Sequence, residues 1–177
     1  MTTELTINGI PLQKSFTFPG GEIQIQLPNL PIIKHNIVNI KTRLNSSAKI
    51  IELLLVKDAL MHYYPTVDVN LEVLYFPYAR QDRRCASGES YSLQVITNII
   101  NKANFASILI ADAHSNKVTA LLKNVTELKA ADIFKLRKTD TKFNLVIAPD
   151  EGAENRAKHI ANDLNKKCIQ ANKMRCT

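Results

Sequence analysis

Short apolar runs recur along the chain and alternate with longer segments in which apolar residues are spaced three or four positions apart. The runs have the length of buried β-strands, and the longer segments have the spacing of helices with one apolar face. Strands are predicted at residues 36–40, 71–76, 107–112, 145–149 and 168–171, and helices at 46–63, at 91–104 and from about 153. This alternation is typical of an α/β fold, a mainly parallel sheet flanked by helices on both faces.

Isoleucine or leucine alternates with glutamine in the segment 22–27, which follows the turn-forming sequence Pro-Gly-Gly at 19–21. Strict alternation indicates a strand with one buried face and one exposed face. We expect this strand to lie at an edge of the sheet, in an antiparallel or mixed pairing.

The polar segment 137–143 separates two stretches of αβ pattern and is the best candidate for a domain boundary. We therefore predict a first domain at residues 1–143 and a second at 144–177. The second contains a single βαβ unit, which is too small for an independent core and is interpreted as an incomplete domain.

Composition narrows the class of protein. The chain of 177 residues is 45% hydrophobic and 22% charged, which is the ordinary range of globular proteins. It shows neither a membrane-spanning run nor a secretory signal, so we expect it in the cytoplasm, with no membrane partner. Its three cysteines form no zinc or disulfide pattern. The net charge of +7 suits anionic partners, including nucleic acid and phosphorylated substrates.

Polar residues follow three of the predicted strands, at 78–84, at 112–115 and at 150–152. Ligands of open α/β sheets collect beyond the carboxyl ends of the strands. The three segments supply guanidinium groups, a side-chain amide, carboxylates and an imidazole, which together can hold a magnesium-bound polyphosphate near a purine. The sequence therefore predicts a nucleotide–metal site.

Simpler interpretations stay open for each segment. Arg80, Asp82 and Arg83 can form a solvated cluster of ion pairs. His114 can be a hydrogen-bonding loop residue, and Asp150 can cap a helix. The mixture of tyrosine, phenylalanine and arginine at 75–80 also permits a platform for single-stranded nucleic acid. We rate this alternative lower and expect no nucleic-acid partner, because the strand predicted at 71–76, which contains two of these aromatic residues, is expected to be buried.

The three segments belong to longer strings, which are F-P-Y-A-R-Q-D-R-R at 76–84, D-A-H-S at 112–115 and A-P-D-E-G-A-E-N-R-A at 148–157. In order and spacing they resemble the ribose-phosphate pyrophosphokinase family. The string F-P-G-G-E-I-Q-I-Q at 18–26 also resembles that family's F-S-D-G-E-x-x-V-x-I segment. The resemblance runs from about residue 16 to the end of the chain.

This resemblance implies a fold of two type I phosphoribosyltransferase-like domains and a homo-oligomer, commonly a hexamer built from dimers. It implies transfer of the β,γ-diphosphoryl group of ATP to the 1-hydroxyl of ribose 5-phosphate, with release of AMP and with Mg²⁺ as cofactor. In such transfers, cations neutralise the charge that develops on the phosphoryl oxygens.

Residue roles follow from the same resemblance. The implied ATP contacts are Arg80, Gln81 and Asp82 in one loop and, from a neighbouring subunit, Gly20, Gly21 and Glu22. His114 and Asp150 would hold the magnesium–ATP complex, and Asp112 and Arg84 are further candidates.

At the C-terminus, Lys173 and Arg175 align with cations that stabilise the transition state in the family. From spacing alone they can equally be a basic tail.

Several positions depart from the family pattern. Gly20 replaces an aspartate, Ala153 replaces a glycine, and Met174 removes a charge. The sequence also stops before the family's D-D-x-x-x-T-G-G-T segment, which cradles ribose 5-phosphate. Two hypotheses follow: the chain is a ribose-phosphate diphosphokinase or a fragment of one, or it is a catalytically silent subunit that binds nucleotide and assembles with a partner.

Overall fold

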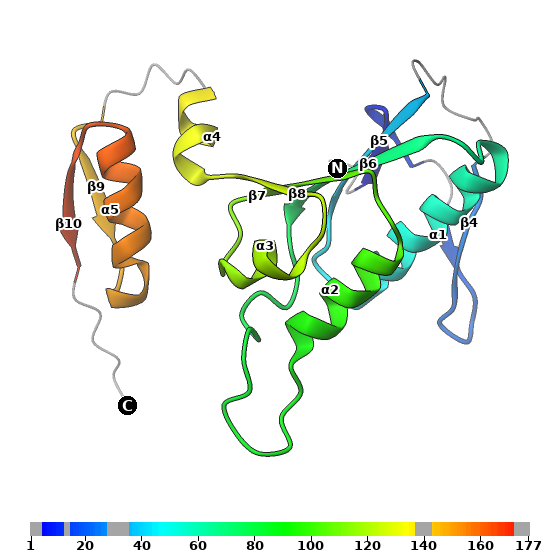
Figure 1. The fold of residues 1–177 in the computed structure, drawn as a ribbon, viewed down its shortest axis with the longest axis horizontal. Coiled ribbons are helices and arrows are strands. Elements are labelled where there is room, and N and C mark those ends of the chain that lie inside the picture. Colours follow the sequence, from blue (N-terminus) through cyan, green and yellow to red (C-terminus); the bar gives the residue numbers. More distant parts are fainter. Residues whose placement is uncertain (1–4, 13–14, 28–35, 137–142, 172–177) are drawn as a thin grey trace. The chain divides into compact units, whose positions relative to one another are not determined.

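A computed structural model describes residues 5–12, 15–27, 36–136 and 143–171 (Figure 1). By its internal contacts the chain divides into two compact units, Met1–Glu127 and Leu128–Thr177. The first unit contains the main sheet and the helices that pack on it. The domain boundary near residue 143 stays a prediction.

Six strands form the sheet of the first unit, in the order β2-β1-β5-β6-β7-β8. Their bounds are β1 Leu5–Ile7, β2 Ile10–Pro11, β5 Ile37–Arg43, β6 Asp68–Tyr75, β7 Ser107–Ala111 and β8 Val125–Leu128. β5, β6 and β7 are parallel, whereas β1 pairs antiparallel with both β2 and β5. The predicted α/β class with a mainly parallel sheet is confirmed, as are the strands predicted within β5, β6 and β7.

Helices α1 (Ser47–Tyr63) and α2 (Ser92–Lys102) match the two long helices predicted from the spacing of apolar residues. α1 begins where the Ser46 side chain accepts a hydrogen bond from the Lys49 amide. It ends before Pro65, because proline disfavours a helical conformation in the residue that precedes it. α2 ends before Asn104, whose φ of 54° is left-handed, as is common just beyond a helix.

Fully buried aliphatic side chains from the strands and helices form the core of the first unit. The largest are Ile40, Leu44, Leu53, Leu60, Leu71, Leu93, Ile100 and Ile110. They come from both α1 and α2 and from all three parallel strands, so helix packing and strand pairing stabilise each other. Burying each such side chain contributes about 1.5–3 kcal/mol.

Helices cover one face of the sheet in the part of the first unit that the structure describes, and α1, α2 and α3 (Lys117–Leu121) lie on the same side of it (Figure 1). β5, β6, β7 and β8 are added in one direction, so right-handed crossovers place every connecting helix on the same face. Our expectation of helices on both faces is therefore wrong for these residues.

The opposite face of the sheet carries polar side chains that bond across the strands. Asn70 donates to the Asn39 side chain at 3.1 Å and accepts from the Ser107 hydroxyl at 2.8 Å. Lys41 and Glu72 form an ion pair at 2.6 Å. Each of these contacts joins residues that lie opposite each other on neighbouring strands. The polar groups are therefore paired across the strands, although no helix in the described part of the first unit covers this face (Figure 1).

The alternating segment 22–27 contains β4 (Ile23–Ile25), which pairs antiparallel with β3 (Ser15–Thr17) in a separate two-stranded sheet. This hairpin packs against α1. The prediction of a half-buried strand is confirmed, but its placement at an edge of the main sheet is wrong. The antiparallel edge consists of β1 and β2, because an alternating pattern reports burial and does not identify the neighbouring strand.

The second unit consists of α4 (Ala130–Leu136), β9 (Leu145–Ala148), the single 3₁₀ turn η1 (Glu151–Ala153), α5 (Glu154–Asp163) and β10 (Lys167–Gln170). β9 and β10 are parallel, and α5 packs on both. The predicted strand–helix–strand unit is confirmed. The sequence patterns missed the shorter elements β1, β2, β3, α3, β8 and α4. No helix among the described residues is long and apolar enough to cross a membrane.

A buried hydroxyl in β5 yields a first prediction. The Thr42 side-chain oxygen has no hydrogen-bond partner among the described residues, and Thr42 is 1% exposed. Thr42→Val keeps the shape and removes the buried polar group, so it should stabilise the protein by about 1 kcal/mol. Urea unfolding measures the change. Thr126→Val, at an exposed position of β8, is the control and should change little; destabilisation by Thr42→Val would show that the hydroxyl is satisfied.

Candidate functional site

The carboxyl ends of β5, β6 and β7 lie at one edge of the sheet, because these strands are parallel. The loops that follow them enclose a pocket of about 380 Å³. Its lining residues are Asn45, Ser46, Ser47, Tyr75, Phe76, Pro77, Tyr78, Ala79, Arg80, Gln81 and His114. The pocket thus lies where the strand ends predict a site, and three of the predicted site residues line it.

Backbone conformation is unusual at the two strand ends that supply those residues. Tyr78, after β6, has φ 57°, and Asp112, after β7, has φ 50°. A bulky aromatic residue rarely adopts this left-handed conformation, which costs on the order of 1–3 kcal/mol. The Tyr78 hydroxyl shares a hydrogen bond of 2.7 Å with the Ser47 hydroxyl at the start of α1. This contact ties the loop after β6 to the helix that begins at the pocket.

Arg80, Gln81 and His114 are the predicted site residues that line the pocket. All three are exposed, and their side chains make no hydrogen bond or ion pair with any residue that the structure describes. Their donors and acceptors therefore remain available for a ligand. The first turn of α1, which begins at the same pocket, contains no acidic residue. Its unpaired N–H groups add partial positive charge, which favours an anion.

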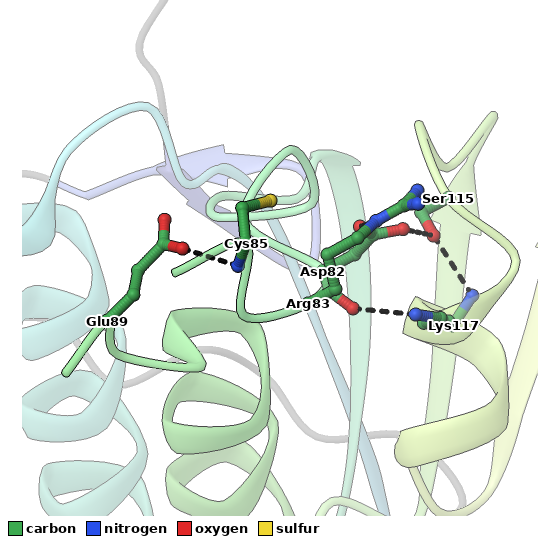
Figure 2. A network of polar contacts seen from close by, with 6 residues as sticks. All are labelled: Asp82, Arg83, Cys85, Glu89, Ser115 and Lys117. Atoms are coloured by element: carbon green, nitrogen blue, oxygen red, sulfur yellow. Dashed lines mark hydrogen bonds and ion pairs between the residues drawn. The ribbon is translucent and has the colours of Figure 1, made fainter. Parts of the chain in front are cut away.

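Asp82 is bonded within the chain instead (Figure 2). One carboxylate oxygen accepts from the Ser115 hydroxyl at 2.8 Å, and the other pairs with Arg83 Nε at 3.1 Å. Lys117 Nζ donates to the Asp82 backbone carbonyl at 2.9 Å. We call Asp82, Arg83, Ser115 and Lys117 the Asp82 network. The ion-pair interpretation thus applies to Asp82 and Arg83, but not to Arg80.

These contacts perturb the acid–base behaviour of Asp82. The hydrogen bond from Ser115, followed by that from Arg83, lowers the pKa of the Asp82 carboxyl below its ordinary value. Because the folded-state pKa is depressed, the stabilisation is complete above the ordinary pKa of about 3.9 and is lost as the pH falls through the depressed value. The difference in unfolding free energy between the unaltered protein and Asp82→Asn should therefore shrink only below about pH 4. A difference that vanishes near neutral pH would contradict this.

The remainder of the loop after β6 is held by its own contacts. The Glu89 carboxylate accepts from the backbone amides of Cys85 and Ala86, at 2.5 and 3.0 Å. Arg84 Nε donates to the Glu89 backbone carbonyl at 3.2 Å, and its guanidinium lies 6.0 Å from the ring centre of Tyr91. Arg84, a further candidate in the sequence, is therefore engaged within the loop and does not line the pocket.

Gly20, Gly21 and Glu22 form the turn of the β3–β4 hairpin and are exposed. Gly21 has φ 94°, a conformation that favours glycine, and a side chain at Gly20 would require the Glu22 carboxylate to shift. None of the three lines the pocket within one chain. Their assignment to the adenine of a neighbouring subunit stays a prediction.

Asp150 belongs to the second unit. Its carboxylate accepts from the Ala153 amide at 3.1 Å, so it caps the 3₁₀ turn η1 as the simpler interpretation expected. The predicted ligand role of Asp150 stays a prediction. Lys173 and Arg175 lie outside the described residues.

The described residues contain no group of three or more histidine, cysteine, aspartate or glutamate side chains that could hold a metal. A Mg²⁺ ion that arrives with nucleotide phosphates needs only one or two carboxylates from the protein. Mg²⁺ prefers oxygen ligands, so the Asp150 carboxylate suits it better than the His114 imidazole. His114 suits a phosphate contact, because its ring nitrogens are unpaired among the described residues.

Sequence reasoning missed Ser47 and Lys117, and it gave no role to Tyr78 and Ser115, although both lie in the segments that it singled out. Ser47 and Tyr78 form their hydroxyl pair across 31 positions, and Ser115 reaches Asp82 across 33. Lys117 carried no signal, because a lysine at the start of a short helix is usually a solvated side chain. The available hint was the presence of serines in the loops that follow β5 and β7, since short hydroxyl side chains commonly satisfy loop and cap groups.

The sequence of this chain is similar to those of several known proteins. No protein-family model matches the sequence. The chain is 31% identical over 151 residues to a ribose-phosphate pyrophosphokinase of Thermoplasma volcanium, covering 85% of this chain and 51% of that protein. It is 32% identical over 165 residues to one of Burkholderia pseudomallei, covering 90% and 52%.

One solved structure is similar in fold to this chain. The phosphoribosylpyrophosphate synthetase of Mycobacterium smegmatis matches with a TM-score of 0.70 over 94% of this chain and 57% of that one, at 19% identity. That likeness shows the shared fold. The chain spans about half the length of the curated relatives that it matches. On the strength of its sequence matches, the chain belongs to the ribose-phosphate pyrophosphokinase family.

Proposed function

We propose that the pocket at the carboxyl ends of β5–β7 binds Mg²⁺·ATP, and that the chain supplies the nucleotide site of a cytoplasmic ribose-phosphate diphosphokinase. The observation that carries this proposal is the convergence of three unpaired polar side chains, Arg80, Gln81 and His114, on one cavity. Relatives that bear the name ribose-phosphate pyrophosphokinase support the choice of reaction.

The chemistry of the lining suits a nucleotide phosphate chain. The planar guanidinium of Arg80 can donate two parallel hydrogen bonds to phosphate oxygens. Gln81 offers an amide, and the start of α1 offers unpaired backbone N–H groups near Ser46 and Ser47. The volume of about 380 Å³ lies in the range of small-molecule sites. Charge-assisted bonds from a rigid frame would set the position of the phosphates.

In the proposed reaction, the 1-hydroxyl oxygen of ribose 5-phosphate attacks the β-phosphorus of ATP. The bond from that phosphorus to the oxygen bridging to the α-phosphate breaks, AMP leaves with the bridging oxygen, and the hydroxyl proton passes to solvent or a base. By resemblance, we assign His114 and Asp150 to holding the magnesium–ATP complex, in which Mg²⁺ would neutralise charge on the transferred group. We assign Lys173 and Arg175, by resemblance, to the same charge neutralisation.

Assembly belongs to the proposal, because the hairpin turn at Gly20–Glu22 does not line the pocket of its own chain. We propose a homo-oligomer, either a dimer or a hexamer built from dimers, in which this turn reaches the adenine bound to a neighbouring copy. Glu22 would then supply a carboxylate, and the two glycines would allow the close approach of the backbone.

Two measurements on the purified protein test the function. Calorimetry should detect Mg²⁺·ATP binding, and an assay for AMP should show release that depends on ribose 5-phosphate and disappears in Lys173→Ala without loss of ATP binding. Equal AMP release without ribose 5-phosphate would contradict the reaction. Binding without turnover would favour the alternative, a nucleotide-binding subunit that assembles with a partner. Absence of ATP binding would overturn both.

A further inference from the structure

Asp82 differs in burial from the other residues of the loop that carries Arg80 and Gln81. Within residues 80–90 every residue is exposed except Asp82, whose side chain is 14% exposed. The same stretch contains no helix or strand. In the part of the chain that the structure describes, Asp82 attaches this stretch to the loop after β7, by way of Ser115 and Lys117 (Figure 2).

The residues of the Asp82 network do not line the pocket, but two of them are adjacent in sequence to residues that do. Arg80 and Gln81, which immediately precede Asp82, line the cavity, and so does His114, which immediately precedes Ser115. Asp82 and Ser115 do not line it. The hydrogen bond between them thus joins the two loops at the residues next to the unpaired ligand-facing groups.

The contacts at Ser115 also orient its hydroxyl. Its oxygen accepts from the Lys117 amide at 3.2 Å, which leaves the hydroxyl proton directed to Asp82 at 2.8 Å. Lys117 contributes a second attachment, because its ammonium binds the Asp82 carbonyl at 2.9 Å. The loop after β6 is therefore held at both the side chain and the backbone of one residue.

We propose that Asp82, Ser115 and Lys117 are positioning residues, which hold Arg80 and Gln81 opposite His114 and do not themselves contact the nucleotide. The inference rests on the proposed nucleotide site and assigns Asp82 a different part in it from the direct ATP contact expected from the sequence. Without the attachment, the loop samples conformations in which Arg80 does not face the pocket. Apparent affinity then falls in proportion to the fraction of competent molecules.

Ser115→Ala tests this role, because it removes one hydroxyl and changes no residue that lines the pocket. Mg²⁺·ATP binding should weaken by about tenfold, as expected for loss of a hydrogen bond to a charged group. Ser115→Thr keeps the hydroxyl and should restore binding. Asn116→Ala is the matched control, since this exposed side chain lies between Ser115 and Lys117 and takes no part in the network.

A double-mutant cycle separates positioning from general stability. In an Arg80→Ala background, Ser115→Ala should weaken binding by less than about twofold, because there is no longer a guanidinium to position. Limited trypsin digestion gives a readout that needs no ligand: cleavage after Arg83 and Arg84 should accelerate several-fold in Ser115→Ala and in Lys117→Met. The thermal midpoint should fall by only about 2–4 °C in both, as expected for the loss of one hydrogen bond.

The outcomes of these experiments distinguish failure of the proposed nucleotide site from failure of the positioning role. If the unaltered protein binds no Mg²⁺·ATP, the proposed function fails and the positioning role fails with it. If it binds but Ser115→Ala binds equally well, or loses the same factor in both backgrounds, only the positioning role is overturned. Unchanged trypsin cleavage in both loop variants would overturn it as well.

Discussion

Replacing Arg80 by alanine is expected to weaken Mg²⁺·ATP binding by about ten- to a hundredfold, the range for losing charge-assisted hydrogen bonds to phosphate. The guanidinium lines the pocket and has no partner among the described residues, so its removal leaves no partner group unsatisfied. Folding should therefore be unaffected. Titration calorimetry measures the affinity, and circular dichroism measures the unfolding midpoint.

Two further variants sharpen the Arg80 experiment. Arg80→Lys keeps the charge but loses the planar fork, so its affinity should fall between those of the unaltered protein and Arg80→Ala. Lys102→Ala removes an equal charge from the C-terminal end of α2, which topology places away from the strand ends, and should bind normally. If Lys102→Ala weakens binding as much as Arg80→Ala, net charge and not the pocket accounts for the affinity.

The largest effect on stability is expected from Leu53→Ala, in the centre of α1. Leu53 is fully buried in the core of the first unit, so truncation removes packed atoms and leaves a cavity. The expected loss is about 2–5 kcal/mol of unfolding free energy. Urea unfolding followed by circular dichroism should show a transition at lower urea concentration with a similar slope.

Ile51→Ala is the matched control, because Ile51 lies on the same helix and is 49% exposed. It should shift the free energy by less than about 0.5 kcal/mol. The chain forms two compact units, so unfolding can show two transitions, and only that of the first unit should move. Equal effects of Leu53→Ala and Ile51→Ala would show that α1 does not pack as described.

Local patterns were sufficient for the elements that bury a continuous apolar face. β6, β7, α1 and α2 each contain enough apolar residues for periodicity to identify them. The shorter strands and helices, such as β1 and α3, span three and five residues and are too short to show a period. Their formation depends on a neighbouring strand or helix that the local sequence does not name.

The placement of the strands and helices, like the shorter elements, was not predictable from local patterns. The alternation of Ile23 and Ile25 with glutamines predicts a half-buried strand, yet its burial comes from β3 and α1 and not from the main sheet. Likewise, strand patterns predicted helices on both faces, but the described part of the first unit has helices on one. Crossover handedness combined with strand order decides the face, and strand order is a tertiary property.

By itself, the sequence determined that polar residues follow buried strands, and this was enough to bring Arg80, Gln81 and His114 to one pocket, because parallel strands end at a common edge. Only the tertiary structure decided which polar side chains are already paired. Asp82 looks equivalent to Arg80 and Gln81 in the sequence, but a hydroxyl 33 positions away binds it. Hydrogen bonds over such separations depend on how loops meet in space, which no local pattern of residues specifies.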